Sequence, residues 1–209
     1  MLKELEAQAI TQFHDTKLSD PVWPSAGTAE TSSGAWLWIE ANHRFNTLLW
    51  NEEDKARRTD VGASEIAASK RLIDQYNQKR NDAVEAIDEA ILSALDDCPR
   101  ANDARLNSET AGAMIDRLSI LSLKIYHMRE QTQRVDASAE HIAKCSEKLQ
   151  RLIAQRNDLA SCFDALLREA MQGRAYFKVY RQFKMYNDPT LNPYLYGRQE
   201  RAGAGGVAP

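Results

Sequence analysis

A three-residue motif, Arg-Asn-Asp, occurs twice in this chain and constrains its fold more than any other feature. The copies stand at residues 80–82 and 156–158, each on a stretch with helical periodicity and each six residues before another aspartate. They are offset by 76 residues (156 − 80), and the same offset brings further similar residues together. These further pairs are Glu40 and Asp116, Trp50 and Tyr126, Arg58 and Arg134, Asp60 and Asp136, Ile66 and Ile142, Ile73 and Leu149, and Asp88 and Asp164. A constant offset across two helical stretches predicts a duplicated αα-hairpin.

Apolar residues recur at helical spacing through most of the chain, and no strand pattern is present. We expect four long helices, at residues 34–58, 63–97, 108–133 and 136–172. Pro99 follows the second of these because proline cannot continue a helix. The loops inside each pair of helices are short, which favours an all-α, antiparallel four-helix bundle made of two hairpins.

The two ends of the chain differ in composition from this helical part. Residues 3–14 have the spacing of a short amphipathic helix, and residues 19–34 form a loop rich in proline, serine and glycine. We therefore divide the chain into four regions. They are an N-terminal helix and loop at 1–34, a helical bundle at 35–173, an aromatic and basic segment at 174–197, and a disordered tail at 198–209.

The composition excludes several classes of protein. Lys and Arg number 27 against 30 Asp and Glu, so the net charge of −3 gives no electrostatic basis for nucleic-acid binding. No window is apolar enough for a membrane span, and the N-terminus lacks the core of a signal peptide. The three cysteines have no CxxC spacing, which is typical of reduced thiols. These features predict a cytoplasmic protein with no nucleic-acid partner.

The inward-facing positions of the first predicted hairpin are unusually polar. At heptad spacing its first helix presents Trp36, Ile39, His43, Asn46, Trp50, Glu53 and Arg57. The second helix adds Lys70, Asn77 and Arg80 to an otherwise apolar face, with Asp74 and Asn81 on its flank. Antiparallel pairing about the turn places Asn46 opposite Asn77 and Glu53 opposite Lys70. Because a buried polar group costs several kcal/mol unless it is matched, such a seam either fixes the packing or lines a site.

The second hairpin serves as an internal comparison for this seam. Under the same offset, His43 corresponds to Ser119, Asn46 to Ser122 and Asn77 to Ile153. We therefore interpret the seam as a ligand cavity confined to the first hairpin, with a purely structural network as the alternative. The candidate ligand-binding residues are His43, Asn46, Glu53, Arg57, Lys70, Asp74, Asn77, Arg80 and Asn81. Their cations suit anionic groups on a ligand, and their amides would fix its orientation.

Two short motifs offer carboxylates for a metal ion. Glu40 and His43 form Glu-x-x-His, and Glu85 and Asp88 form Glu-x-x-Asp, so each pair shares a helix face. Hard oxygen ligands favour Mg²⁺ or Mn²⁺. A metal-dependent phosphohydrolase acting on nucleotides or sugar phosphates is therefore a second hypothesis. Carboxylates that simply point to solvent are the alternative.

The segment 174–184 carries four cations and no acid, interleaved with Tyr176, Phe177, Tyr180 and Phe183. It has the composition to hold a phosphate or stack a base. Packing of the aromatic rings over the helices, with the cations in solvent, is the favoured interpretation.

Four longer runs resemble a bacterial family known as domain of unknown function 4254. They are WLWIEANHRFNTLLWNEEDKARR, KRLIDQYNQKRNDAVEAID, SETAGAMIDRLSILSLKIYHM and YRQFKMYNDPTLNPYLY. The resemblance implies a helical protein encoded among glycosyltransferases for cell-surface polysaccharides, and it assigns no catalytic residue. We therefore expect a cytoplasmic accessory protein that binds a phosphorylated or nucleotide-sugar ligand, or a partner glycosyltransferase. A scaffold without a small-molecule site is a third possibility, and whether the chain is an enzyme stays open.

Overall fold

The computed structural model describes residues 5–25, 33–181 and 188–194, and nearly all of their regular structure is helical. These residues form α1 (Ala7–Leu18), α2 (Ala35–Lys55), α3 (Ala63–Leu95), α4 (Ala111–Thr132), α5 (Ala139–Met171) and the short strands β1 (Arg105–Leu106) and β2 (Ala175–Tyr176). The predicted all-α class is confirmed. The chain divides into two compact units, residues 1–179 and 180–209, and all seven elements belong to the first.

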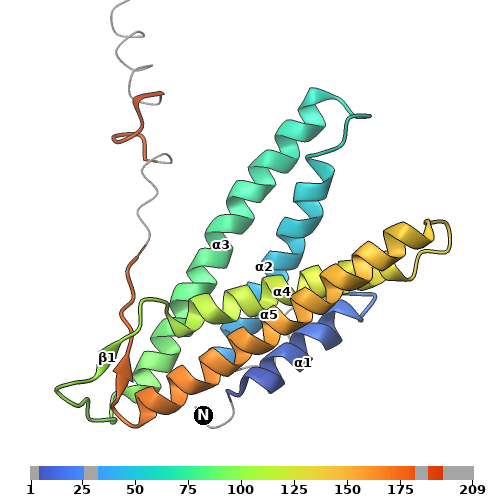
Figure 1. The fold of residues 1–209 in the computed structure, drawn as a ribbon. Helices are drawn as coiled ribbons and strands as arrows, with labels where there is room; N and C mark the ends of the chain where they lie inside the picture. The colour runs from blue at the N-terminus through green and yellow to red at the C-terminus, as the bar shows by residue number, and fades with distance from the viewer. Residues whose placement is uncertain (1–4, 26–32, 182–187, 195–209) are drawn as a thin grey trace, which may run out of the picture. The chain divides into compact units, whose positions relative to one another are not determined.

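Within the first unit, α2 and α3 form one antiparallel hairpin, and α4 and α5 form another. Figure 1 shows that the two hairpins meet at one end and diverge toward their tips. This arrangement differs from a bundle in which four helices pack along their whole length. The burial of α3 gives the reason, since Ser69 and Ile73 are its only buried residues between positions 63 and 82. In the corresponding stretch of α5, residues 139–158, Cys145 is the only buried residue. The outer halves of α3 and α5 therefore have little apolar surface with which to pack against the other hairpin.

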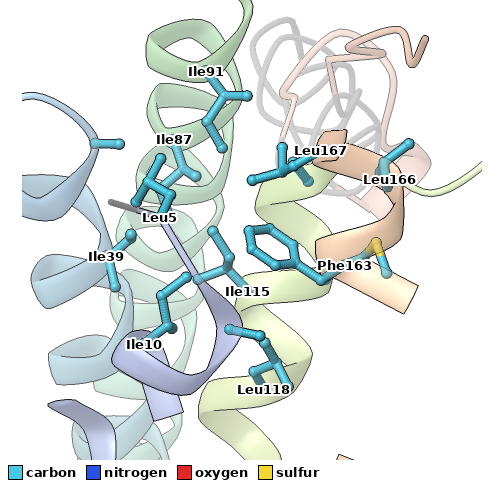
Figure 2. Packing of buried hydrophobic residues seen from close by; sticks show 14 of the residues in the cluster. Leu5, Ile10, Ile39, Ile87, Ile91, Ile115, Leu118, Phe163, Leu166 and Leu167 are labelled. Carbon is cyan, nitrogen blue, oxygen red and sulfur yellow. The ribbon is translucent and has the colours of Figure 1, made fainter. Parts of the chain in front are cut away.

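The hydrophobic core lies where the hairpins meet, and all five helices contribute to it. Figure 2 shows Ile39 of α2, Ile87 and Ile91 of α3, and Phe163 of α5 converging on one cluster. Ile10 of α1 is also fully buried there. The apolar residues recur three or four positions apart on each helix, as a buried helical face requires. Each such side chain contributes about 1.5–3 kcal/mol when fully buried, so this end of the hairpins fixes the fold.

The two hairpins share detailed local features at the offset of 76. α3 and α5 are both 33 residues long and begin at Ala63 and Ala139. At one tip Arg58 donates to both carboxylate oxygens of Asp60, at 3.0 and 2.7 Å. At the other tip Arg134 donates to both oxygens of Asp136, at 3.1 and 2.6 Å. The same residue pair therefore builds the same turn in each hairpin.

The aspartate six residues after each Arg-Asn-Asp motif caps the start of another helix. Asp88 Oδ1 accepts from the Gly112 N–H of α4 at 2.6 Å, and Asp164 Oδ1 accepts from the Ala7 N–H of α1 at 2.9 Å. A carboxylate is stabilising there because the first N–H groups of a helix lack partners in the helix itself. A Cβ at Gly112 would lie 2.5 Å from the Val84 carbonyl oxygen, so only glycine allows α4 to approach α3 this closely.

The segment after α5 turns back along the loop between the hairpins. Gly173 has a φ of +71°, a conformation that ends helices and favours glycine. β2 then pairs in parallel with β1, with Arg105 opposite Ala175. The expectation of no strands was wrong, because two-residue strands are too short to show an alternating pattern. Phe177 is buried, as the packing interpretation predicts, whereas Tyr180 is 74% exposed and Phe183 lies outside the described residues.

Candidate functional site

Polar side chains of α2 turn into the interior of the protein, as the heptad pattern predicts. His43 and Asn46 are 0% and 4% exposed. His43 Nδ1 lies 2.8 Å from Ser119 Oγ on α4. Asn46 Nδ2 donates to the same hydroxyl at 3.0 Å and to Asp116 Oδ1 at 2.8 Å. These contacts form a polar network between the first helices of the two hairpins.

The prediction that the polar interior is confined to the first hairpin is wrong. Ser119 and Ser122, the counterparts of His43 and Asn46, are both fully buried, and Ser119 belongs to this network. Arg156 of α5 donates to Ser122 Oγ at 3.1 Å. A serine on a helix face is small enough to pass for part of an apolar stripe, so its role as a partner was missed.

Helix α1 closes one side of this network. Its Lys17 Nζ donates to Glu40 Oε1 at 3.0 Å, and Glu40 is 1% exposed. Its Asp15 accepts from Arg156 Nη1 at 2.7 Å. Glu40, considered a solvent-exposed or metal-binding residue on sequence grounds, is therefore a buried partner of α1.

Two histidines stack inside the network. The rings of His14 and His43 are 4.3 Å apart between centroids, and Trp23 stacks on His43 at 5.5 Å. Both ring nitrogens of His14 and Nε2 of His43 are buried and have no hydrogen-bond partner among the described residues. Burial lowers the pKa of His43 to about 3 and that of His14 well below its usual value, so both rings are neutral. The sequence could have predicted that His14 is buried, because it lies four residues after Ile10 and therefore on the same face of the helix.

The structure does not gather the four predicted metal ligands. Glu40 is engaged by Lys17, His43 lies beside Ser119, and Asp88 accepts from Gly112. Among the described residues, no group of three or more His, Cys, Asp or Glu side chains could hold a metal ion. The residues present therefore do not fit a Mg²⁺ or Mn²⁺ site.

A pocket of about 420 Å³ opens beside the network, between α2, α3 and α4. Five of the nine predicted ligand-binding residues line it: Asn46, Glu53, Arg57, Asn77 and Arg80. Trp50, Leu49, Ile120 and Leu123 supply its apolar surface, and Asp54 completes the lining. Asn46 and Asn77 share the pocket, in agreement with the predicted pairing of α2 with α3.

The other four predicted residues lie outside the pocket lining. His43 is in the polar interior, and Lys70 and Asp74 are exposed on α3. Asn81 accepts from Arg80 Nη2 at 3.3 Å. Glu53 forms its 2.7 Å ion pair with Arg57, two residues past the end of α2, and not with the predicted Lys70.

Arg80 uses one of its donors within the protein, since Nη2 donates to Asn81, and leaves another without a partner in the described part of the chain. Its Nε is buried without a partner among the described residues. The corresponding residue of the second hairpin, Arg156, donates through Nη1 to both Asp15 and Ser122. A buried donor without a partner costs about 1–3 kcal/mol, so a shift of the Arg80 side chain that brings Nε to an acceptor would recover that free energy.

A family model described as a protein of unknown function, DUF4254, matches residues 36–179, which is more than half of the chain. The chain belongs to the DUF4254 family. Comparisons with curated proteins and with solved structures find no match.

The DUF4254 match contains both hairpins and all the residues that line the pocket. α1 precedes it, although α1 supplies His14, Asp15 and Lys17 to the interior. In the described part of this DUF4254 protein, no helix is sufficiently long and hydrophobic to traverse a bilayer.

Proposed function

We propose that this DUF4254 protein binds a phosphorylated, sugar-bearing ligand, such as a nucleotide-sugar, in the pocket between α2, α3 and α4. The observation that carries the proposal is the contrast between Arg80 and Arg156. Arg156 donates to two side chains of the protein, whereas its counterpart Arg80 keeps the buried Nε unpaired, as far as the described residues go, beside an open pocket. If both arginines served only to stabilise the fold, we would expect the protein to provide hydrogen-bond acceptors for both of them.

The lining of the pocket suits this class of ligand. The guanidinium of Arg80 offers several N–H donors in a planar fork, which matches phosphate oxygens. The amides of Asn46 and Asn77 both donate and accept, as sugar hydroxyls require. Trp50 presents an aromatic surface for a sugar or base ring. The volume of about 420 Å³ lies within the range of small-molecule sites.

The charges of the lining leave Arg80 available for an anion. Glu53 and Arg57 neutralise each other in an ion pair at 2.7 Å. Asp54 is exposed at the rim, where solvent screens it. Arg80 is half-buried and therefore less screened, so it is the cation that a phosphate would meet.

The same proposal includes a cytoplasmic, accessory role in cell-surface polysaccharide synthesis, with a glycosyltransferase as the partner. Its support is the expectation that follows from the family resemblance. Binding is favoured over hydrolysis because Glu40 and Asp88, predicted as metal ligands, already have partners in the fold.

We also infer that the two hairpins descend from one duplicated unit. Three observations support this origin. α3 and α5 have the same length, and their first residues, Ala63 and Ala139, are separated by the same 76 positions as the two Arg-Asn-Asp motifs. The turns at Asp60 and Asp136 also match. Divergence then explains why Asn77 and Arg80 border a pocket while the second hairpin has α1 packed against it.

A thermal-shift panel of nucleotide-sugars, sugar phosphates and free nucleotides tests the binding function. We expect at least one member to raise the melting temperature of the wild type. Arg80→Gln should remove that shift, and Arg71→Gln, an exposed arginine on the same helix, should keep it. No shift with any member, or equal shifts in the two variants, contradicts the proposal. Assaying the panel for phosphate release shows whether binding leads to turnover.

A further inference from the structure

A second groove lies between the hairpins, on the side of α2 that faces α5. Its volume is about 600 Å³, and it is bordered by α2, α4 and α5. Trp50 and Asp54 line both this groove and the pocket described above. The remaining lining residues differ, so the two hollows are separate sites that share one wall.

The walls of this groove are mainly apolar. Trp50 stacks on His127 with ring centroids 4.6 Å apart and an angle of 11° between the planes, which gives a flat surface. Met128 of α4 and Leu152 of α5 extend the apolar lining. Apolar surface exposed in a concave site is a common mark of a binding site for a hydrophobic group.

Three cations border the apolar surface. Lys124 is on α4, and Lys148 and Arg151 are on α5. Neither lysine has an ion-pair partner among the described residues, and Arg151 lies 3.8 Å from Glu147. Asp54 is the one acid in the lining, so cations outnumber acids by three to one. The positive charge favours an anion over a neutral or cationic ligand.

We infer that this groove binds an amphiphilic anion, with one hydrocarbon chain and a phosphate or carboxylate head. The chain would lie on Trp50, Met128 and Leu152, and the head would contact Lys124, Lys148 and Arg151. An amphipathic helix from a partner would require apolar anchors along several turns. The three apolar side chains of this groove form one short patch, which suits a single chain.

Calorimetric titration with dodecyl phosphate, kept below the concentration at which it forms micelles, tests the inference. We expect saturable binding with one site per chain. Lys124→Glu should weaken binding by about tenfold, because it replaces an attraction with a repulsion of similar size. Arg129→Glu changes the charge of an exposed residue on the same helix that does not line the groove, and it should leave the affinity unchanged.

Three ligands and one variant complete the experiment. Inorganic phosphate and dodecyltrimethylammonium should both bind much more weakly than dodecyl phosphate. If either ligand binds as tightly as dodecyl phosphate, the inference is overturned, because a negative charge without a chain, or a chain without a negative charge, would then be sufficient for binding. Tighter binding of an acidic amphipathic peptide at this groove also overturns it. Arg80→Gln should bind dodecyl phosphate as the wild type does, so this test is independent of the nucleotide-sugar pocket.

Discussion

His43 Nδ1 lies 2.8 Å from Ser119 Oγ, and these two residues occupy corresponding positions 76 residues apart in the two hairpins. The hairpins therefore meet face to face at matching points of their first helices. One member of the pair is a large imidazole and the other a small hydroxyl, which lets both fit at a crowded contact. The surrounding polar network links the fold to the pocket, because Asn46 belongs to both.

Ser119→Ala should destabilise the protein by about 1–3 kcal/mol, because His43 and Asn46 would both lose a buried partner. Urea unfolding measures the change. Ser161→Ala, at an exposed site on α5, is the matched control and should change stability by less than about 0.5 kcal/mol. Equal effects of the two substitutions would show that the network contributes nothing to stability.

The stacked histidines predict a loss of stability in mild acid. Their pKa values are lowered in the folded state, so the unfolded chain binds more protons as the pH falls below 6.5. The free energy of unfolding should then drop by up to about 1.4 kcal/mol per pH unit for each histidine. Burial raises the pKa of Asp88 to about 6, which acts in the opposite direction between pH 6 and 3.8. The combined effect of the two histidines is larger than that of the one aspartate, so the free energy of unfolding should decrease as the pH is lowered.

His14→Leu provides the variant for this pH dependence. It removes two buried nitrogens without partners, so stability at pH 7 should stay equal or rise by about 1 kcal/mol. The fall in stability between pH 6.5 and pH 5 should become smaller. Gln8→Leu, at an exposed position of the same helix, makes a similar change in polarity without removing a titratable group and should keep the slope of the wild type. An unchanged slope in His14→Leu would rule out this histidine as its source.

Gly112→Ala should destabilise the contact between α4 and α3. The added Cβ would lie 2.5 Å from the Val84 carbonyl oxygen and 2.9 Å from Asp88 Cγ, so the helices must separate. We expect a loss of about 1–3 kcal/mol in thermal or urea unfolding. At Gly62, the N-cap of α3, an added Cβ would make only an ordinary contact with Ser64 Oγ at 3.7 Å, so Gly62→Ala should change stability by less than about 0.5 kcal/mol. A neutral Gly112→Ala would mean that the helices are not this close.

Arg156→Gln should destabilise the protein by about 1–3 kcal/mol. The arginine is 13% exposed and holds Asp15 of α1 and Ser122 of α4, so its loss leaves partly buried groups unpaired. Circular dichroism during urea unfolding measures this effect. Arg151→Gln, which is 81% exposed, is the control and should have little effect. If the two variants unfold alike, α1 is not anchored through Arg156.

The sequence predicted the elements of the hairpins well, because helical periodicity and an internal offset are local properties. The helix expected at 63–97 is observed at Ala63–Leu95, and that expected at 136–172 is observed at Ala139–Met171. The inward direction of His43 and Asn46 also followed from heptad spacing. The N-terminal helix, expected at 3–14, is observed at Ala7–Leu18.

The partners of the polar residues could not be predicted in the same way. Asp15 and Arg156 are 141 positions apart, and no periodic pattern shows that α1 folds back onto α5. The four predicted metal ligands are not gathered for the same reason. Spacing places Glu40 and His43 on one side of a helix, but the packing of α1 and α4 determines what each of them meets.

The most direct test of the proposed function is the dissociation constant of the best nucleotide-sugar or sugar phosphate, measured by titration calorimetry on Arg80→Gln and on Arg156→Gln. Arg80→Gln should weaken binding by about tenfold or more, while its stability stays near that of the wild type. Arg156→Gln should be less stable and should retain the affinity of the wild type. Wild-type affinity in Arg80→Gln, or an equal loss of affinity in both variants, would contradict the proposal that Arg80 binds the ligand.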